Sequence, residues 1–410
     1  MRKTVKNTFQ KVSLVMAGVL LTLTACSANT VQTDYADIPL QSEMVPSELT
    51  QSASGGQLEE AAKPEQNVIL YDSSSYTVFS NELIDTYFIA CGLLFDFEGN
   101  YLFDPDMKVE YQQTIEHFSS YKNHPFIREL EAYVDMENKY ADMGVLYYLA
   151  QYVISMSNTG LGIANIQSQS FQSDEDFYTF VENLNKFYQD SGAEEFFKTS
   201  KLHENQRQYL SEHMTDVPVH DLLREMEEYV GNKSEVFGGY NIHYCSLISV
   251  YKSPNNATFH TFGMNQDMYL TSIQSPLGFD GNFDVKQLFE SYHHEALHMF
   301  INPGVEGQMQ LIENLAKDKN PSDFVSSQYR NMPWHRITDE AIVRAVQARI
   351  YGIVYQNPEL AYQEILAKEI RAGFQNLDVV YRCLEEYENN RDEYPVIDDY
   401  AVKLVECYLN

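Results

Sequence analysis

The residues of this chain most able to do chemistry lie in the segment YHHEALHMFINP, residues 292–303. It contains the pattern HExxH, with His294 and His298 four residues apart and Glu295 directly after the first of them. Residues four apart in a helix project from one face, so the two imidazoles could hold one Zn²⁺ ion. Glu295 would then act as a base toward water. The alternative is a buried helix whose histidines only make hydrogen bonds.

A zinc site built on this pattern needs a third protein ligand. The extension HExxHxxGxxH does not occur here, because Ile301 and Gly304 stand where Gly and His would be required. We therefore expect a carboxylate from a later helix, and we choose Glu340, in the segment ITDEAIVRAVQARIYG. Glu313 and Asp339 are the alternatives. A plainer interpretation of Glu340 is a glutamate that favours a helix N-terminus.

The helix expected to carry Glu340 also offers groups that would position it. Thr338 or Asp339 could cap the helix, which would place Glu340 in its first turn. Arg344, four residues after Glu340, could orient the carboxylate.

Hydrolysis of a peptide bond also needs a group that stabilises the oxyanion. His335, just before the expected Glu340 helix, is our candidate for this catalytic role, with Tyr269 and His260 as alternatives. Each of the three could instead be a structural ring in the core.

The segment that contains the HExxH pattern should be one amphipathic helix. Apolar residues recur at helical spacing from Val285 onward, and Asp284 could cap the helix. The Asn-Pro pair at 302–303 should end it, because proline cannot continue the hydrogen-bond ladder.

The remaining elements follow from changes in apolar spacing along the body of the chain. Helical spacing fills residues 81–230, and an alternating pattern replaces it at 238–273. There we expect a small antiparallel β insert with a turn at 253–257. The active-site helices at 285–355 and the C-terminal helices at 356–410 follow. The predicted fold is α+β and mainly helical, as one domain or two.

The N-terminus predicts export and anchoring rather than fold. Residues 1–25 have a basic start and a short apolar run, and they end in LTAC at Cys26. This is typical of a bacterial lipoprotein signal, with Cys26 lipidated, although an ordinary secretory signal is the alternative. Residues 26–66 lack an apolar period and read as a disordered tether. We expect the body, residues 67–410, on the extracytoplasmic face of a bacterial membrane.

Charge and cysteine content narrow the partners and the compartment. The formal net charge of −31 argues against nucleic acid as a partner, so contact with the membrane should come through the lipid anchor. The other four cysteines are widely spaced and form no thiolate metal pattern. Cys383 and Cys407 could form a disulfide, or they could be buried free thiols.

Four stretches give the chain a likeness to a known family. They are HFSSYKNHPFI at 117–127, NKFYQDSGAEEFF at 185–197, HEALHMFINP at 294–303 and DEAIVRAV at 339–346. Together, over residues 67–355, they resemble the bacterial family called domain of unknown function 4932, whose members are similar to zinc metallopeptidases of the gluzincin type. The resemblance implies a zincin-like body with His294, His298 and Glu340 as ligands and Glu295 as the base.

These features predict a lipid-anchored, cell-surface zinc metallopeptidase that hydrolyses peptide bonds in a peptide or protein substrate. An extended substrate could pair with an exposed strand edge of the β insert. The alternative, from another class, is a non-catalytic surface binding lipoprotein that keeps a structural or vestigial zinc site. A buried site with four protein ligands and no open position would favour that alternative.

Overall fold

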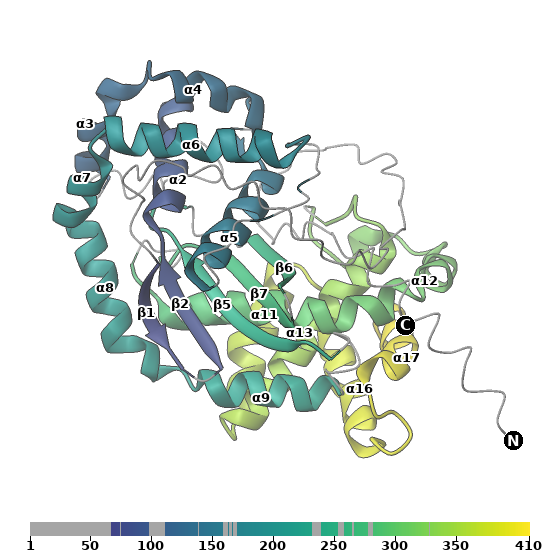
Figure 1. The fold of residues 1–410 in the computed structure, drawn as a ribbon. Coiled ribbons are helices and arrows are strands. Elements are labelled where there is room, and N and C mark those ends of the chain that lie inside the picture. Colours follow the sequence, from purple (N-terminus) through teal and green to yellow (C-terminus); the bar gives the residue numbers. More distant parts are fainter. Residues whose placement is uncertain are drawn as a thin grey trace, which may run out of the picture.

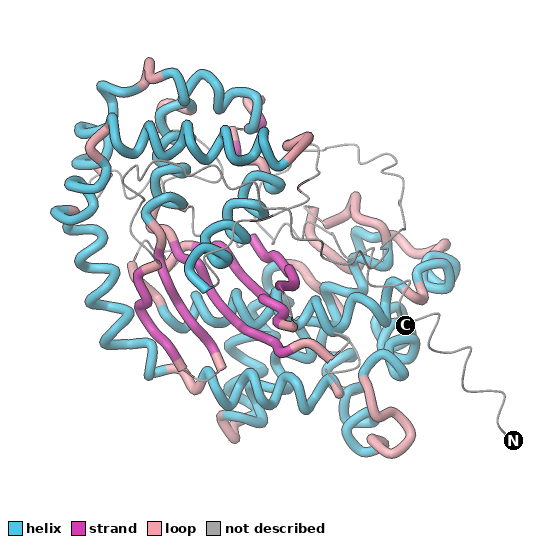
Figure 2. Tube along the Cα trace, viewed as in Figure 1, coloured by secondary structure: helices cyan, strands magenta, loops and turns pink. Residues whose placement is uncertain are grey.

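The computed structural model describes residues 67–410 except 74, 98–110, 138, 159–162, 164–165, 167–169, 232–238, 253–257, 265, 278–281 and 328. The predicted signal, Cys26, the tether and the turn at 253–257 therefore lie outside the described residues. In the described part, helices predominate and a small sheet lies among them (Figure 2). This confirms a mainly helical α+β chain.

The strands and helices have the following bounds. The strands are β1 (Val68–Asp72), β2 (Tyr76–Ser80), β3 (Val134–Asp135), β4 (Tyr140–Ala141), β5 (Asn241–Ile248), β6 (Thr258–Met264) and β7 (Asp267–Gln274). The first helices are α2 (Glu82–Leu94), α3 (Gln112–Phe118), α4 (Pro125–Glu129), α5 (Met143–Asn158), α6 (Asp174–Asp190), α7 (Ala193–Thr199), α8 (Lys201–His213) and α9 (Val219–Val230). The later ones are α11 (Val285–Glu306), α12 (Met309–Ala316), α13 (Trp334–Val354), α14 (Pro358–Ala361), α15 (Ala367–Ala372), α16 (Leu377–Asn389) and α17 (Ala401–Leu409). None of the helices in this part of the chain has the length and apolarity needed to cross a membrane.

The central sheet has five strands in the order β1-β2-β5-β7-β6. β5 pairs in parallel with both β2 and β7, while β1 and β6 pair in antiparallel fashion at the two edges. The expectation of a purely antiparallel insert is therefore wrong. Side chains alternate between faces in both kinds of pairing, so the sequence pattern could not tell which strands would be neighbours.

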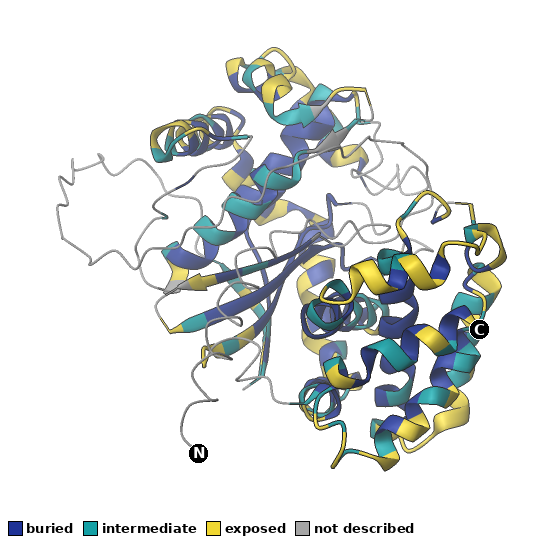
Figure 3. Ribbon diagram, turned by 90° about the vertical axis from the view of Figure 1, so that its right-hand side faces the viewer, coloured by how far each residue is buried: buried dark blue, intermediate teal, exposed yellow. Residues whose placement is uncertain are grey.

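Helices cover both faces of this sheet (Figures 1 and 3). Adjacent residues of a strand enter different cores, as Val78 packs with α11 and α13 while Phe79 packs with α2 and α5. Helices α2 to α7 thus line one apolar core, while α9 and the C-terminal helices line the other; α8 contributes to both through Leu202 and Leu210. Because the sheet is common to both cores, the helical halves belong to one body.

Helix α11 carries the HExxH pattern and begins where the sequence predicts. The Asp284 side chain caps it by accepting a hydrogen bond from the Gln287 backbone N–H at 3.0 Å. The predicted end at 302–303 is wrong, because the helix continues through Pro303 to Glu306. One lost backbone hydrogen bond at the proline is tolerated where neighbouring elements pack on the helix, as the turn Ile397–Tyr400 does here.

Helix α13, which carries Glu340, begins earlier than the sequence suggested. It starts at Trp334, directly after Pro333, so neither Thr338 nor Asp339 caps it. Thr338 instead donates a hydrogen bond to the Trp334 carbonyl within the helix, at 3.0 Å. Glu340 therefore lies in the second turn. Nearly every position of α13 through Gly352 is buried, because the helix lies in the middle of the C-terminal layer.

A disulfide between Cys383 and Cys407 joins α16 to α17. The sequence allowed either a disulfide or two free thiols at these positions, and the structure has the disulfide. Cys91 and Cys245 are free and buried. The bond fixes the C-terminal helix α17, which packs against α11, α12 and α13.

Candidate metal centre

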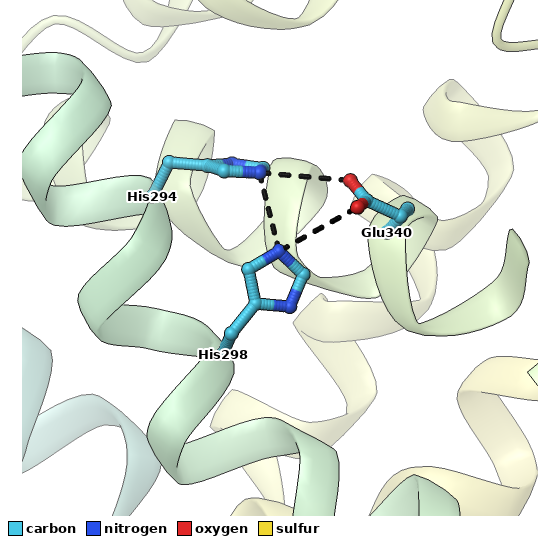
Figure 4. A group of neighbouring side chains, drawn as sticks. All are labelled: His294, His298 and Glu340. Atoms are coloured by element: carbon cyan, nitrogen blue, oxygen red, sulfur yellow. Dashed lines mark hydrogen bonds and ion pairs between the residues drawn. The ribbon is translucent and has the colours of Figure 1, made fainter. Parts of the chain in front are cut away.

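Two neighbouring helices bring three expected ligands together (Figure 4). The Nε2 atoms of His294 and His298 on α11 lie 3.2 Å apart, and they are 3.6 and 3.8 Å from the Glu340 oxygens on α13. One donor atom from each residue lies within 4.8 Å of the others, so this group could hold a metal ion. Among the described residues, no other group of three His, Cys, Asp or Glu side chains does so.

Arg344 holds the Glu340 carboxylate from one helical turn away. Its Nη1 atom donates both to the Glu340 side chain and to the Glu340 carbonyl, the latter at 3.1 Å. Its Nε atom donates to Glu369 at 2.9 Å, and its guanidinium stacks on Phe374 at 4.2 Å. Although burial opposes it, Arg344 and the two histidines hold the pKa of Glu340 well below its usual range. The ligand is therefore ionised.

Asp339 contacts the opposite nitrogen of His298. Its Oδ2 atom lies 3.0 Å from His298 Nδ1, and both side chains are buried. Because a carboxylate oxygen accepts, His298 donates to it through Nδ1, and this directs Nε2 toward His294 and Glu340. Burial opposes protonation, but Asp339, Glu340 and Glu295 raise the pKa of His298 to about 9. Asp339, an alternative third ligand from the sequence, is therefore not in the ligand group and makes an orienting contact instead.

Glu295 is enclosed beside these ligands. It is 3% exposed, and its Oε2 atom makes no hydrogen bond within the described structure. Burial raises the pKa of Glu295 to about 8, and Glu340 and Asp339 add to this while His298 and Arg344 oppose it. A carboxyl group at this place can hold a proton near neutral pH, which suits a group that must take one up and give it back.

The residues present fit a divalent cation. Two imidazole nitrogens and one ionised carboxylate converge, and the two facing nitrogens can share at most a single hydrogen bond. Two nitrogens and one oxygen match the donor set of open zinc sites, which keep a fourth position free. A bound cation would also displace the proton from His298 and lower the pKa of Glu295.

His335 and Glu313 are bound to each other. The His335 Nδ1 atom lies 3.0 Å from Glu313 Oε1, and the His335 backbone N–H donates to the same oxygen at 3.1 Å. Glu313 thus caps the start of α13 and does not belong to the ligand group. His335 begins α13 together with Trp334, more than one turn before Glu340.

Tyr269 and His260, the other oxyanion candidates, point away from α11. On β7, Leu270 belongs to the core that includes α11, whereas its neighbour Tyr269 belongs to the core on the other face of the sheet. His260 contacts the Tyr147 ring of α5, with ring centroids 5.4 Å apart, so it also faces that side. The sheet therefore separates both side chains from the metal ligands.

A cavity of about 450 Å³ also lies on that far side of the sheet. Ile69, Phe79, Ile154, His243 and Tyr269 are among the residues that line it. None of the metal-binding group lines this cavity, so its volume gives no measure of the space around the ligands.

The fold and the site define a mainly helical α+β protein in which an HExxH helix and a glutamate of a second helix form a candidate metal centre. The chain belongs to the family described as Domain of unknown function (DUF4932), whose model matches residues 95–407. The match thus begins at the end of α2. It extends into the C-terminal helices, beyond residue 355, where the resemblance seen in the sequence ends. No curated protein and no solved structure matches the chain.

Proposed function

We propose that this protein is a zinc metallopeptidase of the zincin type, held on the bacterial cell surface by a lipid on Cys26. The observation that carries the proposal is the convergence of His294, His298 and Glu340 within 4.8 Å beside the buried carboxyl group of Glu295. Two histidines and a glutamate from a second helix, with a neighbouring base, form the ligand set of a catalytic zinc site.

Each residue has a distinct part in the proposed reaction. His294, His298 and Glu340 would hold Zn²⁺, which supplies Lewis acidity toward a peptide carbonyl and acidifies water. Glu295 takes the proton from the attacking water and later delivers it to the leaving amine. Arg344 keeps Glu340 ionised and oriented. His335 remains our candidate for stabilising the oxyanion, from the start of α13.

The position of β6 supports a peptide as the substrate class. Within the described residues, β6 is an edge strand with a partner, β7, on one side only. It lies close to the metal helix, since Thr261 of β6 contacts the Met299 sulfur of α11 at 3.3 Å. An extended peptide could pair with such an edge and so be presented to Glu295.

The first experiment measures metal content and activity on the same samples. Purified chain should contain about one Zn²⁺ per molecule and should cleave peptides in a mixed library. Glu295→Gln should retain the zinc but lose cleavage, because the side chain is a base and not a ligand. A chain that takes up no zinc after dialysis against it would refute the proposal. If Glu295→Gln cleaves as fast as wild type, Glu295 is not the base and has another role. If zinc-loaded wild type cleaves no peptide, a non-catalytic binding protein with a structural zinc becomes the better interpretation.

The proposed location has its own support and test. A disulfide such as that between Cys383 and Cys407 is typical of oxidising, extracytoplasmic compartments. Cys26→Ala should release the processed chain from the membrane fraction, because the lipid would be lost. A processed variant that stays with the membrane would show that some other part of the chain holds it there.

A further inference from the structure

Asn302 lies one helical turn after His298 on α11, outside the HExxH pattern, and is 3% exposed. Its amide satisfies its neighbours in one orientation only, with the nitrogen turned toward Asp339. The nitrogen is then 2.6 and 2.8 Å from the two Asp339 oxygens and 3.0 Å from the His298 carbonyl. It is also 3.0 Å from His298 Nδ1, but Nδ1 donates to Asp339 and so does not accept from the amide. An amide carries two N–H groups, so Asn302 can donate to both residues at once.

Asp339 needs such a donor. Its side chain is 3% exposed, and a buried carboxylate is costly unless its oxygens accept hydrogen bonds. His298 supplies one of these through Nδ1, at 3.0 Å from Asp339 Oδ2. Asn302 supplies a second, to Oδ1. The three side chains therefore form a closed network that links α11 to α13.

We propose that Asn302 is a positioning residue of the metal centre, which holds the Asp339 carboxylate where it can orient the His298 imidazole. The proposal rests on the proposed metal site and adds a residue to it. Without the amide donor, Asp339 would turn toward another partner and His298 would lose its fixed orientation. Loss of a hydrogen-bond partner behind a metal-binding histidine typically lowers metal affinity by about 10- to 100-fold.

The test uses an isosteric exchange and its reversal. Asn302→Asp keeps the shape of the side chain but replaces the donor with a second carboxylate facing Asp339. Zinc affinity, measured by competition with a chromogenic chelator, should fall by about 10- to 100-fold. The double variant Asn302→Asp/Asp339→Asn restores one donor and one carboxylate at the same two positions. It should recover most of the lost affinity, which a simple packing defect would not do.

Cobalt provides a readout that does not depend on activity. Co²⁺ placed in the site has visible bands that report the geometry of its ligands, so Asn302→Asp should change them and the double variant should restore them. Asn81→Asp serves as the matched control. Asn81 is also buried, and its side-chain oxygen caps α2, a role that aspartate can fill. This control should keep both the zinc affinity and the cobalt spectrum of wild type.

Two results would overturn the proposal. Asn302→Asp could bind zinc as tightly as wild type, or the double variant could bind no better than the single one. If Asn302→Asp does not fold, Asn302→Leu, similar in size and without a donor, replaces it, and wild-type affinity in that variant would be equally decisive. A wild-type chain without zinc would instead refute the proposed function, so the two failures are distinct.

Discussion

Glu340 is a buried carboxylate whose charge two elements stabilise. Arg344 lies behind it on the same helix, and His294 and His298 face it from α11. Glu313, the alternative ligand, is half-buried, and its Oε1 atom is bound to the backbone N–H and the ring of His335 at the start of α13. Glu340 thus faces the metal-binding histidines, whereas Glu313 caps a helix. Mutating each in turn therefore separates loss of a ligand from loss of a cap.

We expect Glu340→Ala to weaken zinc binding by more than about a hundredfold, because it removes one of three ligands. Glu313→Ala should bind zinc within a fewfold of wild type and should instead lower stability by about 1 kcal/mol, as the loss of a helix cap does. Equilibrium dialysis and thermal unfolding measure the two effects. The reverse pattern, with tight zinc in Glu340→Ala and none in Glu313→Ala, would show that a different helix completes the site.

The metal ligands could be predicted from the sequence better than the residues that orient them, such as Asp339 and Asn302. HExxH is local, and its helix fixes His294 and His298 on one face whatever surrounds them. Successive residues of a helix point about 100° apart, so the roles of Asp339 and Glu340 depend on how α13 is rotated. Nothing in the sequence gives that rotation. The sequence marks Asn302 only as part of a helix end, since Asp339, the carboxylate it contacts, comes from another helix.

At the scale of elements, the start of α13 links the metal ligand to the rest of the C-terminal layer. Trp334, the single tryptophan, is 8% exposed and packs edge-on against Phe324, with ring centroids 5.2 Å apart. Phe324 in turn packs on Tyr408 of α17. The tryptophan therefore reports on the segment that leads into the Glu340 helix.

Removing the metal should change the emission of Trp334. Chelation leaves one carboxylate and two imidazoles without their shared partner, which should loosen the first turns of α13. We expect a shift or quench of fluorescence with a chelator, and recovery when zinc is added back. Glu340→Ala should abolish the reversible part. Emission that stays constant while the zinc content falls to zero would mean that α13 is held in place without the metal.

A second contact between elements concerns the end of α11. Asp398, in the turn Ile397–Tyr400, packs on Gly304, where an added Cβ would lie 2.5 Å from Asp398 Oδ1. That oxygen is buried and makes no hydrogen bond within the described residues. Burial and the neighbouring Asp399 raise the pKa of Asp398 to about 7. The folded chain thus binds a proton that the unfolded chain releases near pH 4.

Asp398 should therefore make stability depend on pH. Its folded pKa is above the unfolded one, so its contribution becomes unfavourable as pH rises from about 4 to about 7 and stays so above that. Asp398→Asn, which cannot ionise, should be more stable than wild type at pH 8 by roughly 2 to 4 kcal/mol and gain little at pH 4. Denaturant unfolding at both pH values measures this. The exposed Asp323→Asn is the control, and an equal gain at both pH values would contradict the explanation.

The helices were more predictable than the sheet, for a physical reason. Spacing of 3.6 residues is a property of a single segment, so α9 and α11 could be found from their own residues. Sheet order depends on which distant segments meet, and β2 pairs with β5 across the whole N-terminal helical half. Helix ends also depend on neighbours, and packing around Pro303 carries α11 one turn beyond the predicted stop.

At the scale of the whole molecule, one sheet separates two apolar cores, and the metal centre belongs to the C-terminal one. The last helix, α17, closes that core and contacts four of its helices, α11, α12, α13 and α16. Chain ends fray unless they are tied down. Here the tie is the disulfide from Cys407 on α17 to Cys383 on α16, which closes a loop of 24 residues.

Breaking this disulfide should lower the stability of the fold and speed the release of bound zinc. A loop of this length corresponds to about 3 kcal/mol of stabilisation through the unfolded chain, so Cys383→Ser/Cys407→Ser should unfold about 5 °C lower than wild type. Because α17 packs on α11 and α13, looser packing should also speed zinc release. Calorimetry and a stopped-flow chelator assay measure the two effects.

Cys245→Ala, which removes a buried sulfur but no crosslink, controls for packing alone. A double variant that melts lower but releases zinc at the wild-type rate would show that α17 stabilises the core without supporting the metal helices.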